Sequence, residues 1–566
     1  MCNFISQGGA MKGLIIFRRI RPLALSLLLM TVGVFPLRAL QPIKDNKPRL
    51  VVRVVVEQMR YEMLLRYWDR FGEDGFRKLV DEGVACRNAR IGYAQPDRSS
   101  GFATLSTGTY PSMHGIVADH WYDRLSSEQK LAIDHPHYRG LGGEQENGNY
   151  SPHNLMTSTT GDELKLINGQ SKVFSLGMHP ASAILGTGKM SDGAFWMDDP
   201  TANWMTNTYY MDSLPQWTSD FNAMDLEQIY MHRKWELLLP DSTYLASTTD
   251  GDDSEEGFML LYRNEFPYNL RTLKRKARGY KYLKYTPFGN TYTKDFALAL
   301  IANENLGADA HTDLINIAFS ASSYVNELFG PRSMEMEDLY LRLDREIAHL
   351  LTFLEERFSK DHVLVVLTSD RGAADSYEFR NRHGLTASEF NPRQGLTLLR
   401  SYLNVVYEPD QWITGYSHRQ IYLDHGLIDQ NGYDINDFQE TVARFMVKKS
   451  GVSYAVKSST IQNSSYSEGM MKMVQNSFHP ARSGDISLVL APGIMEKPNR
   501  SGSIYSYDTH IPMIWWGNGF PDGTINSEVN LRDVAPTISY LLNIPYPDAS
   551  FGKPIIPLIE QERTGF

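Results

Sequence analysis

The sequence predicts an α/β protein with a mostly parallel central sheet, helices on both faces of that sheet and an inserted cap region. Two observations predict this fold class. The run Leu50–Arg60, LVVRVVVEQMR, is rich in β-branched residues without apolar–polar alternation, which is typical of a parallel strand buried on both faces. Residues 314–368 then have the periodicity of a strand, a helix and a strand, a unit whose crossover should be right-handed.

The remaining elements follow from hydrophobic periodicity and from cap and turn residues. They are helices over 61–82, from Ser99 with serine caps, within 438–449 and from Asp533, and strands at 85–93, 486–490 and 512–516. Side chains that follow parallel strands gather at the carboxyl edge of a sheet, where α/β proteins bind their ligands. Glu57 and Asp370, each at the end of a predicted strand, are therefore candidate site residues.

The chain divides into a leader and one large domain. Residues 1–39 have basic residues, an apolar run and a small residue at Ala39, the layout of a secretory signal peptide, with an uncleaved anchor as the alternative. The domain should cover 47–566, with a cap insertion at about 123–297 and a second irregular insertion at about 376–483. We expect an exported bacterial protein, periplasmic or envelope-associated, without a transmembrane span in the mature chain.

The composition excludes several partners and cofactors. A net charge of -10, without a long run of like charges, gives no basic surface for nucleic acid. The sequence has only two cysteines, Cys2 and Cys86, so neither a disulfide framework nor a cysteine-based metal site is expected. Cys86 should be a small buried residue rather than a nucleophile.

Motifs spread over nearly the whole mature chain resemble those of a known family. They are VVVEQMR, GFATLSTGTYPSMHGI, AFWMDD, YVNELFGP, LTSDRGAA, RSGDISLVLAPG, YSYDTHIP and DVAPTI. On these motifs the chain resembles the alkaline phosphatase superfamily, most closely the bacterial PafA-like alkaline phosphatases and the type I phosphodiesterase/nucleotide pyrophosphatases. The resemblance implies two zinc ions held by three aspartates and three histidines, and a threonine or serine nucleophile at a helix N-terminus. Two metals suit phosphoryl transfer because they stabilise the attacking and the leaving oxygen.

Carried over residue by residue, the resemblance places substitutions throughout the site. The nucleophile position, three residues before the glycine of its motif, is Arg98, with Ser99 or Ser100 as the fallback. The metal-ligand positions are Glu57, Ser323, Glu327, Asp370, Arg371 and Ser501, and the phosphate-contact positions are Asp119, His179 and Ala181. Serine hydroxyls are poor zinc ligands, so we predict no bound zinc and no catalytic residue.

The charges at these positions suggest what replaces the metals. Buried carboxylates need counter-ions, and arginine presents a planar fork that matches a carboxylate. We therefore expect an ion network of Arg98, Arg371, Glu57, Asp370 and Glu327 in place of the zinc ions. The protein would then be a pseudophosphatase that acts in binding or scaffolding in the cell envelope, with an envelope protein or an anionic small molecule as its partner.

Two alternatives stay open. The chain is an active phosphate monoester or diester hydrolase if Ser99 or Ser100 attacks phosphorus at a rebuilt site, which holds two zinc ions or one hard cation such as magnesium. That single cation would bind Glu57, Asp370 and either Asp97 or Asp119, because magnesium prefers oxygen ligands. In the third reading the arginines bind an anion, since Arg98 precedes a helix N-terminus.

Overall fold

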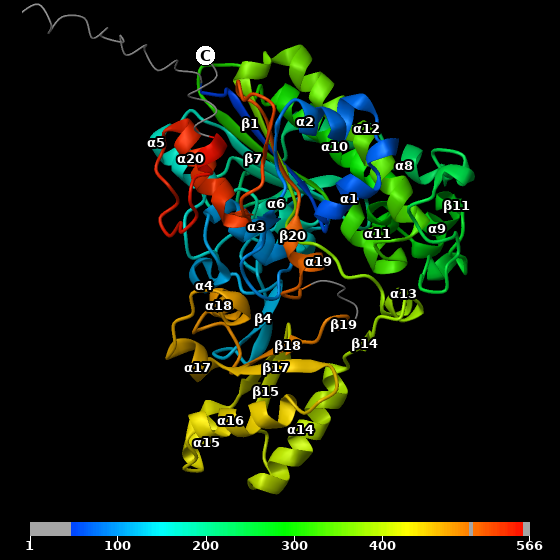
Figure 1. The fold of residues 1–566 in the computed structure, drawn as a ribbon. Helices are drawn as coiled ribbons and strands as arrows, with labels where there is room; N and C mark the ends of the chain where they lie inside the picture. The colour runs from blue at the N-terminus through cyan, green and yellow to red at the C-terminus, as the bar shows by residue number, and fades with distance from the viewer. Residues whose placement is uncertain (1–46, 497–501, 559–566) are drawn as a thin grey trace, which may run out of the picture. The chain divides into compact units, whose positions relative to one another are not determined.

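The computed structural model describes residues 47–496 and 502–558 and has a ten-stranded central sheet (Figure 1). Its strand order is β22-β2-β21-β13-β1-β12-β7-β8-β9-β6, and the five strands from β13 to β8 are parallel. The predicted α/β class with a mostly parallel sheet is confirmed. The predicted signal peptide, 1–39, lies outside the described residues.

Strand β1 (Leu50–Val56) lies at the centre of the sheet, between β12 (Asp313–Phe319) and β13 (Val363–Thr368). Its side chains alternate between two apolar layers, with Val54 in one core cluster and Val55 in the other. Both faces of the strand are therefore covered, which explains why its sequence lacks polar alternation.

Helices cover the two faces of this sheet (Figure 1). Side chains of α10 (Pro287–Asn303) and α12 (Met334–Arg357) belong to the first core cluster. Those of α3 (Arg98–Thr107), α6 (Pro180–Ile184) and α20 (Val534–Leu542) belong to the second. Helix α3 thus packs on the sheet with its first residue near the carboxyl end of β1.

The predicted cap insertion, 123–297, differs from what the structure shows. Its first part contributes four strands to the central sheet: β6 (Gly140–Leu141), β7 (Val173–Gly177), β8 (Gly193–Met197) and β9 (Trp204–Asn207). These strands are only two to five residues long, so each gives a weak periodic signal. The later part forms elements outside that sheet, namely α7 (Gln216–Asn222), α8 (Leu226–Met231), β10 (Lys234–Trp235), β11 (Tyr268–Asn269) and α9 (Leu270–Ala277).

The second predicted insertion, 376–483, has regular structure and a core cluster of its own. Its four-stranded sheet has the order β15 (Ile413–Ser417), β16 (Gln420–Leu423), β18 (Ile486–Leu490) and β17 (Val452–Lys457). The helices α14 (Pro392–Val406) and α16 (Ile435–Met446) pack against it. The predicted strand at 486–490 therefore exists, but it belongs to this smaller sheet.

Other predicted elements shift or divide. The predicted helix over 61–82 is broken into α1 (Tyr61–Arg66), two short turns and α2 (Lys78–Asp81). The predicted strand over 85–93 is two strands, β2 (Val84–Cys86) and β3 (Ala89–Arg90), which belong to different sheets. The strand at 512–516 is β21 (Met513–Gly517), which runs antiparallel to β13. The central sheet ends at β22 (Gly523–Ile525).

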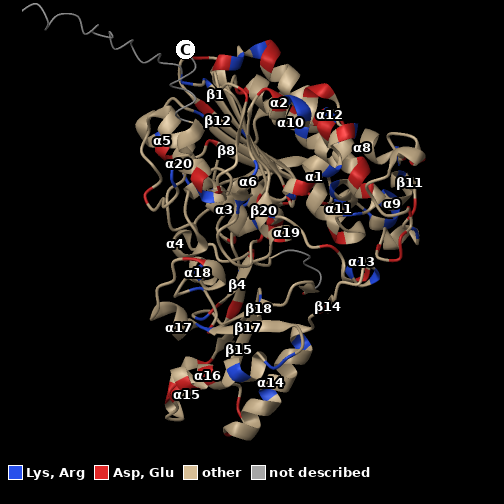
Figure 2. Cartoon of the chain, in the orientation of Figure 1, with Lys and Arg blue, Asp and Glu red and all other residues tan. Residues whose placement is uncertain are grey.

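Cys86 is buried, as predicted, and its burial raises the pKa of the thiol to about 12. Such a thiol is a poor nucleophile at neutral pH. Among the described helices, none is long and apolar enough to cross a membrane. Figure 2 shows Lys and Arg interspersed with Asp and Glu along helices such as α12.

His114, the last residue of α4 (Pro111–His114), is fully buried as a neutral imidazole. Its Nδ1 accepts a hydrogen bond from the Ile116 backbone N–H at 3.1 Å, and its Nε2 lies 3.1 Å from the Thr104 hydroxyl. Burial lowers the pKa of His114 from 6.5 to about 3. Between these two pH values the unfolded chain therefore binds a proton that the folded chain does not bind.

We expect the free energy of unfolding to fall as the pH falls from 6.5 towards 3, with His114 contributing up to about 1.4 kcal/mol per pH unit. His114→Gln should flatten this part of the profile in urea unfolding measured at several pH values. The exposed His137→Gln is the matched control and should leave the slope unchanged. Equal slopes in all three proteins would contradict this account of His114.

Candidate functional site

The candidate site begins at Glu57, which directly follows β1 and has 0% of its surface exposed. Its Oε2 accepts a hydrogen bond from Arg98 Nε at 2.9 Å, and its Oε1 accepts from the hydroxyls of Ser182 at 2.6 Å and Ser320 at 2.8 Å. Burial alone would raise the pKa of Glu57, but the charges of Arg98 and Arg371 and the two hydroxyls outweigh it and lower the pKa. Glu57 is therefore an ionised carboxylate whose two oxygens are both held by protein groups.

Arg98 occupies the nucleophile position as the first residue of α3. Besides its ion pair with Glu57, its Nη2 donates to the Ser323 hydroxyl at 3.2 Å, and the guanidinium lies 5.4 Å from the centre of the Tyr324 ring. Only 7% of Arg98 is exposed. The side chain thus points into the site and fills it with a fixed positive charge.

Helix α3 begins at Arg98 because Asp97 caps it. The Asp97 carboxylate accepts from the backbone N–H of Ser100 at 2.9 Å, and the Ser100 hydroxyl receives the Asp97 N–H in return at 3.0 Å. This capping box replaces the predicted serine cap at Ser99. Because the Ser100 hydroxyl is bonded to Asp97 in this box, Ser100 does not suit the role of the second fallback nucleophile.

A second ion pair joins Arg371 and Asp370 at the end of β13. Arg371 Nη1 contacts Asp370 Oδ2, while Asp370 Oδ1 accepts the backbone N–H of Gln58 at 2.9 Å. Arg371 Nη2 also donates to the Ser323 hydroxyl, at 3.3 Å. Since Ser323 accepts from both arginines, it links the two ion pairs into one network.

The structure places the other predicted site residues less centrally. Glu327 is exposed, and one of its carboxylate oxygens accepts from the Tyr285 hydroxyl at 3.3 Å. His179 caps α6, where its Nδ1 accepts the Ala181 N–H at 3.1 Å, and burial lowers the pKa of His179 far below its ordinary value. Ser501 lies outside the described residues. The predicted network therefore has Ser323 as its bridging group, with Glu327 at its exposed margin.

The N-terminus of α3 is occupied by carboxylates of the protein. Asp119 Oδ1 accepts the Ser99 backbone N–H at 2.8 Å, next to the bond between Asp97 and the Ser100 N–H. Free amides at a helix N-terminus are what favours phosphate binding. Here two negative charges already hold these amides, so the reading in which an anion binds at this helix end does not fit.

The residues at the metal-ligand positions do not fit two zinc ions. Zinc requires three or four nitrogen, sulfur or carboxylate ligands, but the oxygens of Glu57 and Asp370 are bonded to guanidinium, hydroxyl and amide groups. The same contacts argue against a magnesium ion on these two carboxylates. Each oxygen of these two carboxylates therefore already has a protein partner.

One group of metal-binding side chains among the described residues comprises Asp97, Asp119 and His418. A ligand atom of each lies within 4.8 Å of the ligand atoms of the other two. The sequence analysis missed His418, which lies in the turn between β15 and β16 and about three hundred residues beyond Asp119. No motif or spacing could have joined it to the other two.

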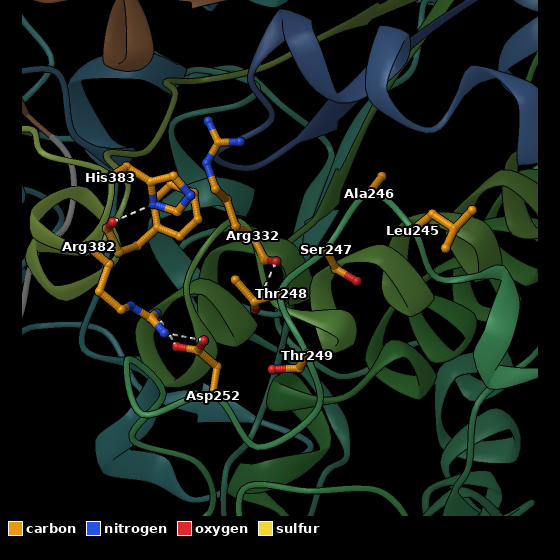
Figure 3. A pocket seen from close by; sticks show the side chains of 10 residues that line it. Leu245, Ala246, Ser247, Thr248, Thr249, Asp252, Arg332, Arg382 and His383 are labelled. Carbon is orange, nitrogen blue, oxygen red and sulfur yellow. Dashed lines mark hydrogen bonds and ion pairs between the residues drawn. The ribbon is translucent and has the colours of Figure 1, made fainter.

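A separate pocket with a volume of about 430 Å³ lies beside α13 (Tyr377–Arg382). Figure 3 shows Arg382 paired with Asp252, with an Nη1–Oδ2 distance of 2.7 Å, and Arg332 beside this pair. Arg332 is bonded to Asp375 at 2.8 Å, so both arginines already have carboxylate partners. The pocket is lined by Leu245, Ala246, Ser247, Thr248, Thr249, Asp252, Arg332, Phe379, Arg382 and His383.

Residues 51–508 match the family described as type I phosphodiesterase / nucleotide pyrophosphatase, and the chain belongs to this family. The predicted resemblance to the alkaline phosphatase superfamily is thereby confirmed.

Particular relatives are the alkaline phosphatases PafA of Elizabethkingia meningoseptica, 32% identical over 91% of this chain and 95% of that protein, and PhoV of Synechococcus elongatus, 31% identical over 91% and 93%. A protein of Myroides odoratus named calcium-transporting ATPase is 34% identical over 92% of this chain and 96% of its own. The crystal structure of wild-type PafA superposes with a TM-score of 0.86 at 32% identity, covering 91% of this chain and 99% of that one.

Removing one partner of the Glu57–Arg98 pair should be costly because the other charge stays buried. We expect Arg98→Ala to lower the free energy of unfolding by about 3–5 kcal/mol. The double variant Arg98→Met/Glu57→Gln removes both charges and keeps an acceptor for the two serines, so it should recover most of that loss. Urea unfolding measures both effects.

Arg444→Ala is the matched control for the Arg98 variants, because its ion pair with Glu440 is exposed. It should cost less than about 0.5 kcal/mol. If Arg98→Ala is as mild as Arg444→Ala, or if the double variant is no more stable than Arg98→Ala, the buried ion pair does not have the role given to it here.

Proposed function

We propose that this protein is a non-hydrolytic member of the family, a pseudophosphatase that acts in binding or scaffolding in the cell envelope. The observation that carries the proposal is the contact set of Arg98, which stands at the nucleophile position and bonds to Glu57 and Ser323, two of the metal-ligand positions. One side chain thus replaces the nucleophile and uses the groups that would face a metal. Fold membership alone does not establish activity.

Electrostatics at the helix end support the same conclusion. A phosphate ester needs donors and positive charge where its oxygens lie. The phosphate-contact position Asp119 instead brings a carboxylate to the Ser99 amide, and the other two such positions are a helix-capping histidine and Ala181. Burial alone would raise the pKa of Asp119. The positive charges of Arg98, His418 and Arg371 outweigh this effect and lower the pKa, so Asp119 is ionised. A phosphate would meet a negative charge there.

A working hydrolase is the second candidate, and one observation favours it. The Ser99 hydroxyl is buried, has no hydrogen-bond partner and lies at the first turn of α3. A nucleophile needs a base or a metal to activate it, and among the described residues no side chain accepts a hydrogen bond from the Ser99 hydroxyl as a base would. The non-hydrolytic reading accounts for more of the site, since it explains both arginines and Asp119.

The partner is proposed to be an envelope protein or an anionic small molecule. The pocket beside α13 offers the small molecule a place, because its volume of about 430 Å³ lies in the range of ligand sites. Arg332 stacks on the Phe379 ring at 4.8 Å, and Arg382 is half exposed. An anion could bind there by competing with Asp252 for Arg382.

Hydrolysis of nitrophenyl phosphate and bis-nitrophenyl phosphate, measured with and without added zinc, tests the proposal. We expect turnover at the buffer background in both conditions, because Arg98 cannot attack phosphorus and the carboxylates are held by arginines. Ser99→Ala and Asp370→Asn should leave this background unchanged. Zinc-dependent turnover that Ser99→Ala or Asp370→Asn abolishes would establish the hydrolase instead.

A further inference from the structure

Three metal-binding side chains converge beside the N-terminus of α3, and none of them is at a zinc-ligand position of the family. Asp97 is the cap of α3, Asp119 precedes β4 (His120–Asp123), and His418 lies in the β15–β16 turn. Their ligand atoms lie within 4.8 Å of one another, and His418 Nε2 is 3.3 Å from Asp97 Oδ2. Two carboxylates and one imidazole thus meet at one place. Asp97 Oδ2 accepts the Asp119 backbone N–H and Asp119 Oδ1 accepts that of Ser99, but these donors are neutral amides rather than the guanidinium groups that hold Glu57 and Asp370, so lone pairs remain for a cation.

The orientation of His418 suits a metal ligand. Its Nδ1 lies 3.3 Å from the Ser417 hydroxyl, which leaves Nε2 facing the two carboxylates. Metal-binding histidines commonly have such a partner on the ring nitrogen that does not face the metal, because it fixes the ring and its tautomer. The ring of His120 lies edge-on to that of His418 with 4.5 Å between centroids, so a second imidazole is adjacent.

The charges around this cluster do not balance. Each guanidinium of the network already faces a carboxylate of its own, Glu57 for Arg98 and Asp370 for Arg371. The carboxylates of Asp97 and Asp119 add two further negative charges. The neighbouring Arg419 also has a carboxylate partner, since it faces Glu496 at 3.6 Å. A divalent cation has the charge that this region lacks.

An independent observation points to a ligand at the same place. Ser99 is 1% exposed, its hydroxyl has no hydrogen-bond partner, and its backbone N–H is 2.8 Å from Asp119 Oδ1. A buried hydroxyl without a partner costs about 1–3 kcal/mol. A cation with bound water offers this hydroxyl an acceptor or a donor beside Asp119.

We propose that Asp97, Asp119 and His418 bind one divalent transition-metal ion, with Zn²⁺ as the best match. Zinc accepts both imidazole and carboxylate ligands, whereas magnesium and calcium prefer sites made of oxygen alone. The ion connects the β15–β16 hairpin to the N-terminus of α3 and neutralises the two carboxylates. This inference does not depend on the proposed function, because none of the three ligands stands at a zinc-ligand position of the family.

Isothermal titration of the chelator-treated full chain with Zn²⁺ alone tests the site. One ion should bind per chain. His418→Ala and Asp119→Asn should each weaken binding by at least about 10-fold, because even the loss of a residue that only supports a metal ligand commonly has an effect of this size. His425→Ala is the matched control, an exposed imidazole that pairs with Asp485 in the same small subdomain. It should bind Zn²⁺ like the unchanged protein, and so should Asp370→Asn.

Thermal unfolding with and without Zn²⁺ separates loss of the site from loss of the fold. The unfolding temperature of the unchanged protein and of His425→Ala should rise with Zn²⁺. The unfolding temperature of His418→Ala should be the same with Zn²⁺ as with chelator. His418→Gln, which keeps a polar side chain, replaces His418→Ala if the latter does not fold. No saturable binding, or equal binding by the His418 variants, would overturn the proposal.

The two proposals fail in different ways. Zn²⁺ binding that Asp370→Asn abolishes and His418→Ala preserves would place the ion at the family's zinc position. That result would overturn both this site and the replacement of zinc by arginines. Absence of any Zn²⁺ binding would overturn only the site at Asp97, Asp119 and His418.

Discussion

A carboxylate buried at the end of the central strand must be neutralised, and the rest of the site depends on how this is done. Glu57 has no exposed surface and leaves no oxygen without a partner. In a metal-binding relative a cation would supply the charge, whereas here Arg98 supplies it from the first turn of α3. Leaving such a charge unpaired would cost several kcal/mol, so the arginine couples the site to folding of the sheet and of α3.

This coupling explains how a fold can persist while its site changes. The chain superposes on wild-type PafA over nearly all of its length, and the strand order carries Glu57 and Asp370 to neighbouring strand ends. Two guanidinium groups that share the Ser323 hydroxyl bridge these carboxylates. The network neutralises both carboxylates with side chains of the protein, so arginines stabilise this edge of the sheet.

Much of the fold could be predicted because β1, β12 and β13 are long apolar strands with clear limits. The strands β7 and β8 are only five residues long, and their local sequence does not distinguish them from the predicted cap, because pairing with β12 and with each other defines them. At the site, Arg98 and Glu57 were predictable from motif positions. The role of Asp97 as the helix cap and the approach of His418 were not, because both depend on how distant segments pack.

The replacement of zinc by arginines is tested most directly by a crystal structure of the protein grown with zinc, with anomalous diffraction recorded at the zinc edge. The account predicts that Arg98 remains paired with Glu57 and Arg371 with Asp370, and that no anomalous peak lies between these carboxylates. A zinc peak coordinated by Glu57 and Asp370, with either arginine turned away, would contradict it.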